Sequence, residues 1–206
     1  MPDPGFPPLF GGVAALDFAN TLDGRATAQP EEFLRGYADV AGWAAYAGLI
    51  DGKTAGRLTD LFGPGGRAGE GEGALRTAVE LREAIFQVFG AVGRGEPAPP
   101  AALAVVQARY SDAMAVARLA AEGDGFAWRF AGDDPGRAWW PVAVSAVRLL
   151  TGGPLDRVKV CAAEAGCIGL FLDTSKNRSR RWCTMDGCGV EAKVQRQARR
   201  RAARRA

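Results

Sequence analysis

Residues 161–188 read CAAEAGCIGLFLDTSKNRSRRWCTMDGC and hold all four cysteines of the 206-residue chain. The cysteines form two pairs: five residues separate Cys161 from Cys167, and four separate Cys183 from Cys188. Four thiolates in two pairs complete the closed tetrahedral shell of a structural Zn²⁺, a borderline-soft ion that binds sulfur well. This stretch therefore predicts one structural zinc ion that holds the C-terminal part of the chain together.

The two alternatives for the cysteines are four ordinary free thiols and two disulfides. The chain begins MPDPGFPP, which has neither the basic nor the apolar region of a signal peptide, and no stretch approaches 18 uninterrupted apolar residues. We therefore expect a cytoplasmic protein that does not span a membrane. In that reducing compartment a cysteine cluster is more often a metal site than a set of disulfides.

The residues between the cysteine pairs indicate small elements that would position the ligands. Residues 168–172 read as a strand, residues 173–179 as a polar turn, and residues 180–184 as a return strand that carries Trp182. A helix is expected from about Gly189, so knuckle, hairpin and helix give a treble-clef-like module. Trp182 fits either the small core of this module or a surface on which a base stacks.

Basic residues surround the predicted zinc site and continue to the end of the chain. From Arg157 onward there are 13 Lys and Arg against 4 Asp and Glu, a net charge of +9, whereas residues 1–156 carry −6. Guanidinium groups bind phosphates through paired hydrogen bonds, so this division predicts a polyanion-binding arm on an acidic body; the alternative is a solvated basic terminus. The candidate nucleic-acid-binding residues are Lys176, Arg178, Arg180, Arg181, Lys193, Arg196, Arg199, Arg200 and Arg204.

The part of the chain before the cysteines shows mostly helical periodicity. Apolar side chains repeat at helical spacing over residues 33–50, 75–92 and 103–117, and Pro141 begins a fourth helix that stops at Gly152 and Gly153. Strand signals are fewer. Residues 126–130 alternate like one strand of a hairpin with a turn at 132–136, residues 6–18 are compatible with a strand, and residues 63–73 and 93–100 read as loops.

The expected fold class is therefore mostly α (α+β), in three parts. Residues 1–155 form a helical domain with a small β element, residues 156–192 a zinc finger, and residues 193–206 a basic helix or tail. Because the helical stripes can cover one another, the first part is expected to fold without the finger.

The segment C-x₅-C, then FLDTSKNRSRRWCTM at 171–185 and Cys188-Gly189 before a basic helix, resembles the CGNR zinc finger. Upstream, LDFANTL at 16–22, Arg25, the helix with Trp43 and LREAI at 81–85 resemble the ABATE domain that accompanies this finger. The resemblance covers nearly the whole chain and implies a bacterial, stress-associated transcription regulator whose finger binds DNA. One difference is that Val190-Glu191 stand where the family has Asn-Arg, so a carboxylate replaces a cation beside the zinc ligands.

Three polar residues interrupt the apolar opening of the helical part: Asp17, Asn20 and Arg25. They would line a pocket for a small-molecule effector, as a sensor domain needs. The alternative is that Asp17 and Asn20 cap a helix or pair with buried backbone groups.

The composition narrows the function classes. The chain has no histidine, which excludes Ser-His-Asp and Cys-His hydrolases and His-ligated catalytic metals. Since no motif pairs a nucleophile with a base, we do not expect an enzyme. The leading interpretation is a zinc-containing DNA-binding regulator with an N-terminal sensor or dimerisation domain, and hence a homodimer as one arrangement. The alternative is a non-enzymatic zinc adaptor that binds RNA or protein.

Overall fold

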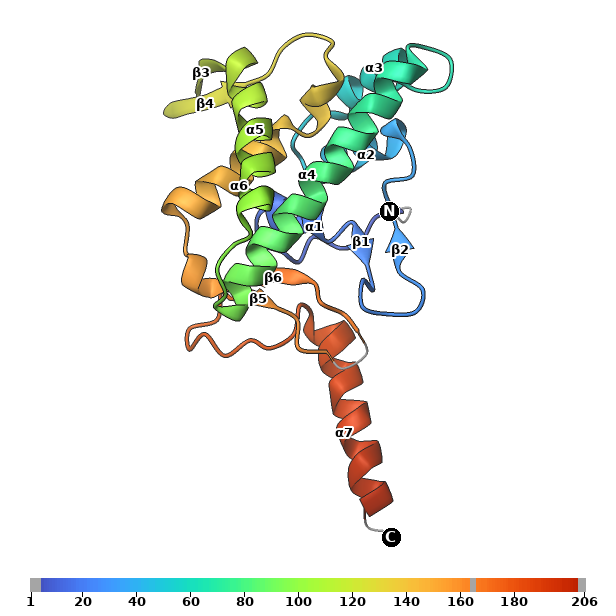
Figure 1. Cartoon of the computed structure of the whole chain (residues 1–206), viewed down its shortest axis with the longest axis vertical. Helices are drawn as coiled ribbons and strands as arrows, with labels where there is room; N and C mark the ends of the chain where they lie inside the picture. Colours follow the sequence, from blue (N-terminus) through green and yellow to red (C-terminus); the bar gives the residue numbers. More distant parts are fainter. Residues whose placement is uncertain (1–4, 164–165, 204–206) are drawn as a thin grey trace.

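The computed structural model describes residues 5–163 and 166–203 and confirms the mostly α fold class (Figure 1). These residues form seven α-helices: α1 (Ala14–Ala19), α2 (Tyr37–Tyr46), α3 (Gly52–Phe62), α4 (Ala68–Arg94), α5 (Pro100–Val116), α6 (Trp140–Gly152) and α7 (Val190–Ala203). The strands form three antiparallel pairs: β1 (Leu22–Asp23) with β2 (Glu31–Glu32), β3 (Arg118–Glu122) with β4 (Gly125–Arg129), and β5 (Val158–Val160) with β6 (Leu170–Leu172). Short turns of other helix types are η1 (Pro135–Ala138), η2 (Leu155–Arg157) and η3 (Met185–Gly189). None of the described helices is long and apolar enough to cross a membrane.

The body is built around α4, which runs diagonally through it and packs against α1, α2, α3 and α5 (Figure 1). The core is apolar and aromatic, with the rings of Phe18 and Trp43 at 4.8 Å between centroids and both side chains fully buried. Helix α6 closes the opposite side against α1 and α5. It begins with Pro141 in its first turn and stops at Gly153, as the sequence predicts.

Two helical segments differ from the sequence prediction. Helix α3 was not predicted; its signal was Asp51, which accepts a hydrogen bond from the backbone N–H of Thr54 at 2.7 Å as an N-cap. Helix α4 begins at Ala68, inside the segment 63–73 that was predicted as a loop. The reason is packing: α4 passes so close to the end of α3 that a Cβ on Gly71 would lie 1.9 Å from the carbonyl oxygen of Phe62. Glycine is thus needed here for the close approach of two helices.

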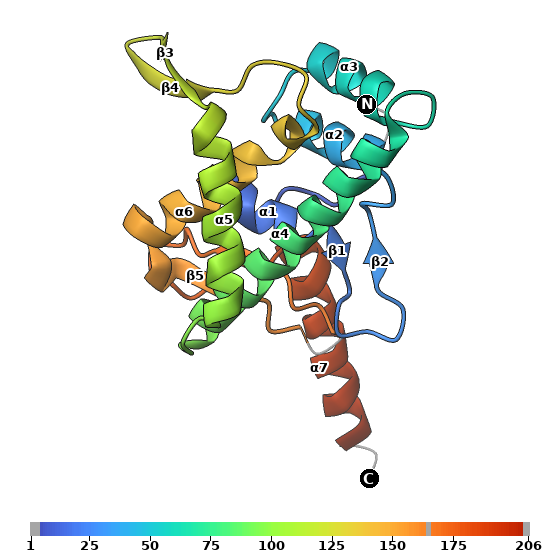
Figure 2. The same ribbon diagram turned by 45° about the horizontal axis from the view of Figure 1, so that its top comes forward.

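Two strand predictions also need correction. The segment 6–18 contains most of α1, a short helix whose residues 15–19 are all buried. Because no face of this helix is exposed, its sequence lacks the helical repeat of polar and apolar residues. The strand at 126–130 does pair in a hairpin, but its partner is β3, which precedes it, and the turn is the two-residue loop 123–124. Figure 2 shows this hairpin projecting from the end of α5.

The last strand pair joins the finger to the body. The predicted return strand at 180–184 does not form; β6 pairs with β5 instead, in the register Val158↔Leu172 and Val160↔Leu170. Strand β6 is buried on both faces: Leu170 and Leu172 belong to the helical core, whereas Phe171 packs against the cysteines. A three-residue strand thus separates the two cores.

The hairpin β5–β6 therefore belongs to the body as much as to the finger. Val158 on β5 is buried in the same cluster as the side chains of α4 and α1, together with Leu170 and Leu172. The expectation that the helical domain covers its own core does not hold for this face. The amino-acid composition changes near residue 155, but one hydrophobic core includes side chains from both sides of this position.

Candidate metal centre

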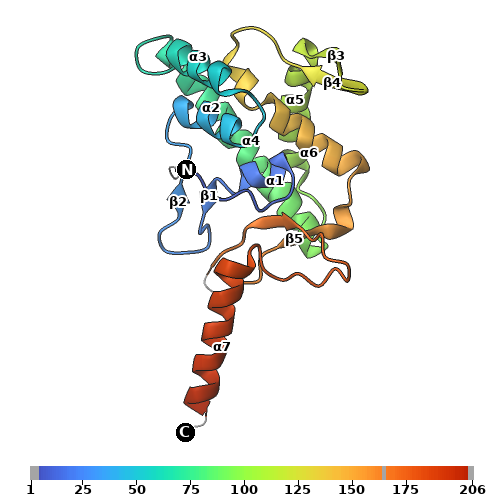
Figure 3. The ribbon, with the colours of Figure 1, turned by 180° about the vertical axis from the view of Figure 1, so that it is seen from behind.

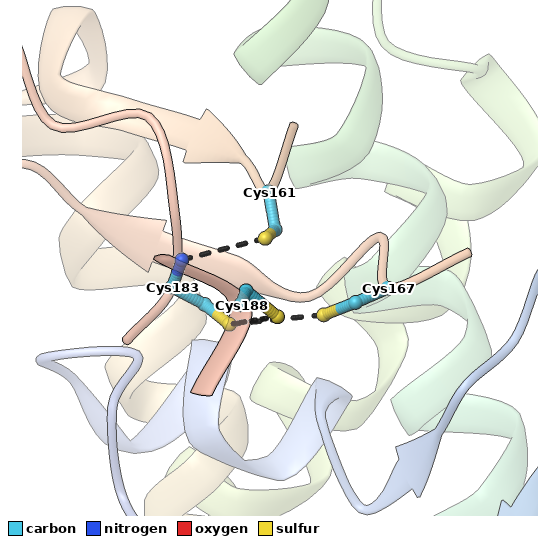
Figure 4. A group of neighbouring side chains, drawn as sticks. All are labelled: Cys161, Cys167, Cys183 and Cys188. Carbon is cyan, nitrogen blue, oxygen red and sulfur yellow. Dashed lines mark hydrogen bonds between the residues drawn. The ribbon is translucent and has the colours of Figure 1, made fainter. Parts of the chain in front are cut away.

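The four cysteines are brought together by the ends of β5 and β6 and by the start of α7 (Figure 4). Cys161 follows β5 directly, and its backbone N–H donates to the carbonyl of Gly169 at 2.9 Å. Cys167 lies on the approach to β6, Cys183 comes after the loop that leaves β6, and Cys188 lies in η3. Thr184 caps η3 by accepting a hydrogen bond from the backbone N–H of Gly187 at 3.2 Å. Backbone hydrogen bonds therefore hold Cys161 and the turn that carries Cys188.

The sulfur positions fit a tetrahedral metal ion. All four Sγ atoms lie within 4.8 Å of one another, with 3.7 Å between Cys167 and Cys183 and 3.6 Å between Cys183 and Cys188. Zinc–sulfur bonds of 2.3 Å in a regular tetrahedron place the sulfurs about 3.8 Å apart. The same distances are far too long for S–S bonds, and all four cysteines are free thiols. The geometry therefore fits one metal ion and not two disulfides.

The electrostatics of the cluster agree with this assignment. Hydrogen bonds from Cys167 and Cys183 lower the pKa of the Cys161 thiol below its usual range, and the contact with Cys161 raises the pKa of Cys167. The pKa of Cys183 is raised by the same neighbours. Four sulfurs this close cannot all carry charge by themselves, because each thiolate repels the next. A dication among them removes that repulsion and favours the thiolate form of all four.

The loop from Asp173 to Arg180 is held by a buried carboxylate. The side chain of Asp173 is fully buried and accepts hydrogen bonds from the Lys159 ammonium at 2.5 Å, from Ser175 at 2.6 Å, and from the backbone N–H of Arg180 at 3.0 Å. Burial alone would raise the pKa of Asp173; the Lys159 charge and these hydrogen bonds outweigh it and hold the pKa well below its usual range. Asp173 thus remains ionised and fixes the loop that leads to Cys183.

Arg180 connects this loop to the zinc ligands. Its guanidinium donates to the carbonyls of Trp182 at 3.0 Å and Leu172 at 3.3 Å and also to that of Cys183, and it lies 4.4 Å above the ring centroid of Phe171. The side chain therefore binds the peptide carbonyls directly before and after the Cα of the ligand Cys183. Sequence reasoning placed Arg180 among the nucleic-acid contacts, whereas its position here is that of a support for the metal site.

We expect Arg180→Ala to weaken zinc binding by about 10- to 100-fold, since outer-shell partners of metal ligands have effects of this size. The cause is the loss of three carbonyl partners and of the contact with Phe171. Competition with a chromophoric chelator measures the change. The matched control is Arg181→Ala, because this neighbouring arginine is exposed and makes no such contacts to the backbone. Equal zinc affinity in the two variants would contradict the assignment.

The remaining basic candidates fall into two groups. Arg178 forms an ion pair with Asp156, and Lys176 is exposed in the loop. The second group lines a groove of about 290 Å³ between α7 and the finger, and it comprises Arg181, Lys193, Arg196 and Arg199. Trp182 borders the same groove, packs with its other side against the cysteine core, and carries the Arg181 guanidinium 5.5 Å from its ring centroid. Arg200 is exposed on α7, and Arg204 lies outside the described residues.

The structure gives Asp17, Asn20 and Arg25 partners within the protein. Asp17 accepts the backbone N–H of Gly11 at 2.7 Å, and burial raises its pKa to about 6. Asn20 pairs with both backbone groups of Leu170, donating at 2.9 Å and accepting at 2.8 Å. Arg25 forms an ion pair with Glu83 at 2.7 Å. The cavity beside Asn20 and Arg25 measures about 10 Å³, room for about one water molecule. Their assignment to an effector pocket stays a prediction.

Sequence reasoning missed the residues that support the metal site. Lys159 and Asp173 were not singled out, although an aspartate directly after the apolar run 170–172 is a usable signal: a charged side chain next to a buried strand needs a partner. Arg157 was also missed; it donates to the carbonyls of Asp173 at 2.8 Å and Ser175 at 3.2 Å. These contacts join residues 14 to 18 positions apart, which no local pattern shows.

Two family models match the chain and meet between its body and its finger. Residues 12–153 match the ABATE model, described as "Putative stress-induced transcription regulator", and residues 157–201 match the CGNR zinc finger. No curated protein matches the chain significantly. The second match covers the four clustered cysteines, so the metal they bind is zinc, one ion per chain.

Proposed function

Because the chain belongs to the ABATE family and carries a CGNR zinc finger, we propose that it regulates transcription by binding DNA through the finger and α7. The zinc ion has a structural part in this: a closed Cys₄ shell leaves no position for a substrate. The acidic helical body would supply the sensor or dimerisation part. The family description and the zinc finger support this assignment, and the arrangement of α7 carries it further.

The observation that carries the proposal is the position and charge of α7. The helix projects away from the body (Figure 1), and its main contacts within the described part of the chain are with η3 of the finger. Its 14 residues, about 21 Å long, carry five cations and a single acid, Glu191. Among the described residues, Lys193, Arg196, Arg200 and Arg201 have no acidic partner. A free-standing basic helix of this length fits the major groove of DNA.

The zinc site fixes the base of this helix. Cys188 lies in η3, which runs directly into α7, so the metal holds the first turn of the helix against the finger. The groove between Arg181 and the Lys193–Arg196 face is then a second basic surface beside the helix. A phosphate backbone that follows this groove would meet cations from both elements, which positions the helix without reading the sequence.

We expect the full chain to bind duplex DNA with a log–log salt slope of about −4 to −5, because about five of its cations would meet phosphates. Removal of residues 193–206 should flatten most of that slope, since α7 carries most of these cations. Fluorescence anisotropy of a labelled duplex across a range of salt concentrations measures both. The matched control is Arg76→Ala, an exposed arginine on α4 of the body, which should leave the slope unchanged.

The substitution Glu191→Arg is a second test of DNA binding by α7. Glu191 is the acid of α7 and is exposed. If this position faces DNA, the substitution replaces repulsion by attraction and tightens binding at low salt. Competition between duplex DNA and a hairpin RNA at matched salt separates the regulator from an RNA-binding adaptor. An intact, zinc-loaded chain that shows no salt-sensitive binding to any DNA would overturn the proposed function.

A further inference from the structure

A cavity of about 600 Å³ lies on the side of the body away from the basic groove. It is an open cleft bordered by the hairpin β3–β4, by α6 and by the start of α1; Figure 3 shows α1 and α6 on this side of the molecule with the hairpin above α6. The walls are apolar and aromatic, from Leu49, Phe126, Trp128, Phe130 and Val144. Cavities of this size and composition are typical of small-molecule sites.

One face of α6 forms the floor of the cavity. Pro141, Ser145, Arg148 and Gly152 recur at helical spacing and all line it, while the opposite face of the helix is buried in the core. The hydroxyl of Ser145 accepts a hydrogen bond from the backbone N–H of Ala15 at 3.1 Å, which fixes the floor against α1. The floor is therefore preformed.

The hairpin presents an apolar face that the protein does not cover. In the register of β3 and β4, Leu119 lies opposite Trp128 and Ala121 opposite Phe126, so these four side chains share one face. Phe126 is 74% exposed and Leu119 is 59% exposed. An aromatic side chain left in water at the rim of an apolar cavity gains free energy when a ligand covers it.

The charge at the cavity selects the ligand. The side chain of Arg148 is exposed and, among the described residues, forms neither an ion pair nor a hydrogen bond. The acid at the same rim, Glu122, already pairs with Arg129 at 2.6 Å. The cavity thus offers an apolar volume with one uncompensated cation at its edge, which complements an apolar body that carries one carboxylate.

We propose that this cavity is the effector site of the protein and takes a small apolar carboxylic acid, with its carboxylate on Arg148 and its body against Phe126 and Trp128. The proposal rests on the sensor role in the proposed function and names its site and ligand class. It places the effector away from Asp17, Asn20 and Arg25, whose side chains have partners within the protein.

The cavity wall runs directly into the finger at two places. Val13 and Ala14 line the cavity, and two residues earlier the carbonyl of Gly11 accepts the backbone N–H of Leu172 on β6 at 2.9 Å. On the other side, Gly153 and Pro154 line the cavity and lead through η2 into β5. A ligand that shifts either wall therefore moves a strand that holds the zinc ligands.

The test compares acids with their neutral amides on the full, zinc-loaded chain. Isothermal titration calorimetry with phenylacetate, indole-3-acetate and octanoate, each against its amide, should show the acids binding severalfold more tightly, the value of one ion pair at an exposed arginine. Arg148→Gln should remove this preference. Arg76→Gln, an exposed arginine on α4 outside the cavity, should keep it.

Gly152→Phe tests the location. A Cβ on Gly152 meets no heavy atom within 4 Å and the backbone there is an ordinary helical end, so a phenyl ring can occupy the cavity without disturbing the fold. The variant should lose binding of acid and amide alike while its melting temperature is kept. Binding equal to that of the unmodified chain, or the absence of binding by any of the three acids, would overturn the site.

The link to the finger is read without DNA. Saturation with the bound acid should change the rate at which EDTA removes zinc severalfold, because both cavity walls contact the finger strands; an unchanged rate in the presence of bound acid would overturn the effector role. Since neither readout uses DNA, failure of DNA binding rejects the proposed function and leaves the cavity assignment standing. Failure of acid binding with intact DNA binding rejects the cavity assignment alone.

Discussion

Cys183→Ser is expected to lose zinc and to unfold the finger, with effects on the order of 10 kcal/mol on the free energy that couples metal binding to folding. The Sγ of Cys183 lies within 3.7 Å of two other ligand sulfurs and its residue is buried between Phe171 and the cysteines, so no other side chain can take its place. Metal analysis of protein purified without added zinc should find about one equivalent in the unmodified chain and almost none in the variant.

Thr174→Ala serves as the control, because Thr174 is exposed in the loop between the cysteine pairs and is no ligand. It should keep one equivalent of zinc. Mass spectrometry under non-reducing conditions adds an independent check: the denatured chain should have the mass of four free thiols. A well-folded, metal-free chain, or a mass lowered by two disulfides, would contradict the assignment.

The metal site was predictable from the sequence because it depends on the type and spacing of the ligand residues and not on one particular backbone conformation. Thiol ligands need no particular local conformation as long as the chain can bring them within about 4 Å, and four cysteines in 28 residues meet that condition with many backbones. The conformation between them was less predictable. A return strand at 180–184 would have to pair with β6, but β6 pairs with β5 instead. The conformation of residues 180–184 is set by the hydrogen bonds of Asp173 and Arg180.

The attachment of the finger to the body was beyond local pattern reading. Asn20 and Leu170 are 150 residues apart, and the pair forms because the amide side chain offers a donor and an acceptor in the same geometry as a neighbouring strand. Asn20 was considered for an effector pocket, for a helix cap and for pairing with buried backbone groups. The last alternative is the contact that Asn20 makes, but its polarity alone does not name the partner, Leu170. The same limit applies to the cavity, whose floor and hairpin come together only through the packing of α5 and α6.

This attachment restricts how the protein can work. On one face of β6, Leu170 and Leu172 pack into the helical core, and on the other face Phe171 packs against the cysteines, so the finger cannot rotate freely as a tethered module would. A change in the body reaches the zinc site as a shift of β5 or β6 and not as a change in linker length. Under the proposed function, a signal from the body would therefore act on the orientation of α7, which follows directly from η3 and Cys188.

A chain that ends at residue 156 is expected to be destabilised by about 5 kcal/mol or more, because it loses the buried side chains of Val158, Leu170 and Leu172 from its core. It also leaves Asn20 and the carbonyl of Gly11 without their backbone partners on β6. Against a total stability of about 5–15 kcal/mol, this lowers the melting temperature by about 10–20 °C and exposes an apolar face that binds a hydrophobic dye.

The matched control is a chain that ends at residue 192, which keeps β5, β6 and all four cysteines and lacks only residues 193–206. Because α7 packs mainly against η3 and none of its described side chains belongs to the helical core, this chain should melt within a few degrees of the full protein in thermal scans followed by circular dichroism. Asn20→Ala in the full chain should fall between the two, since it breaks the amide pair and keeps the buried strand. If the chain ending at 156 melts cooperatively at the temperature of the full protein, the shared core contributes little and the two parts are independent after all.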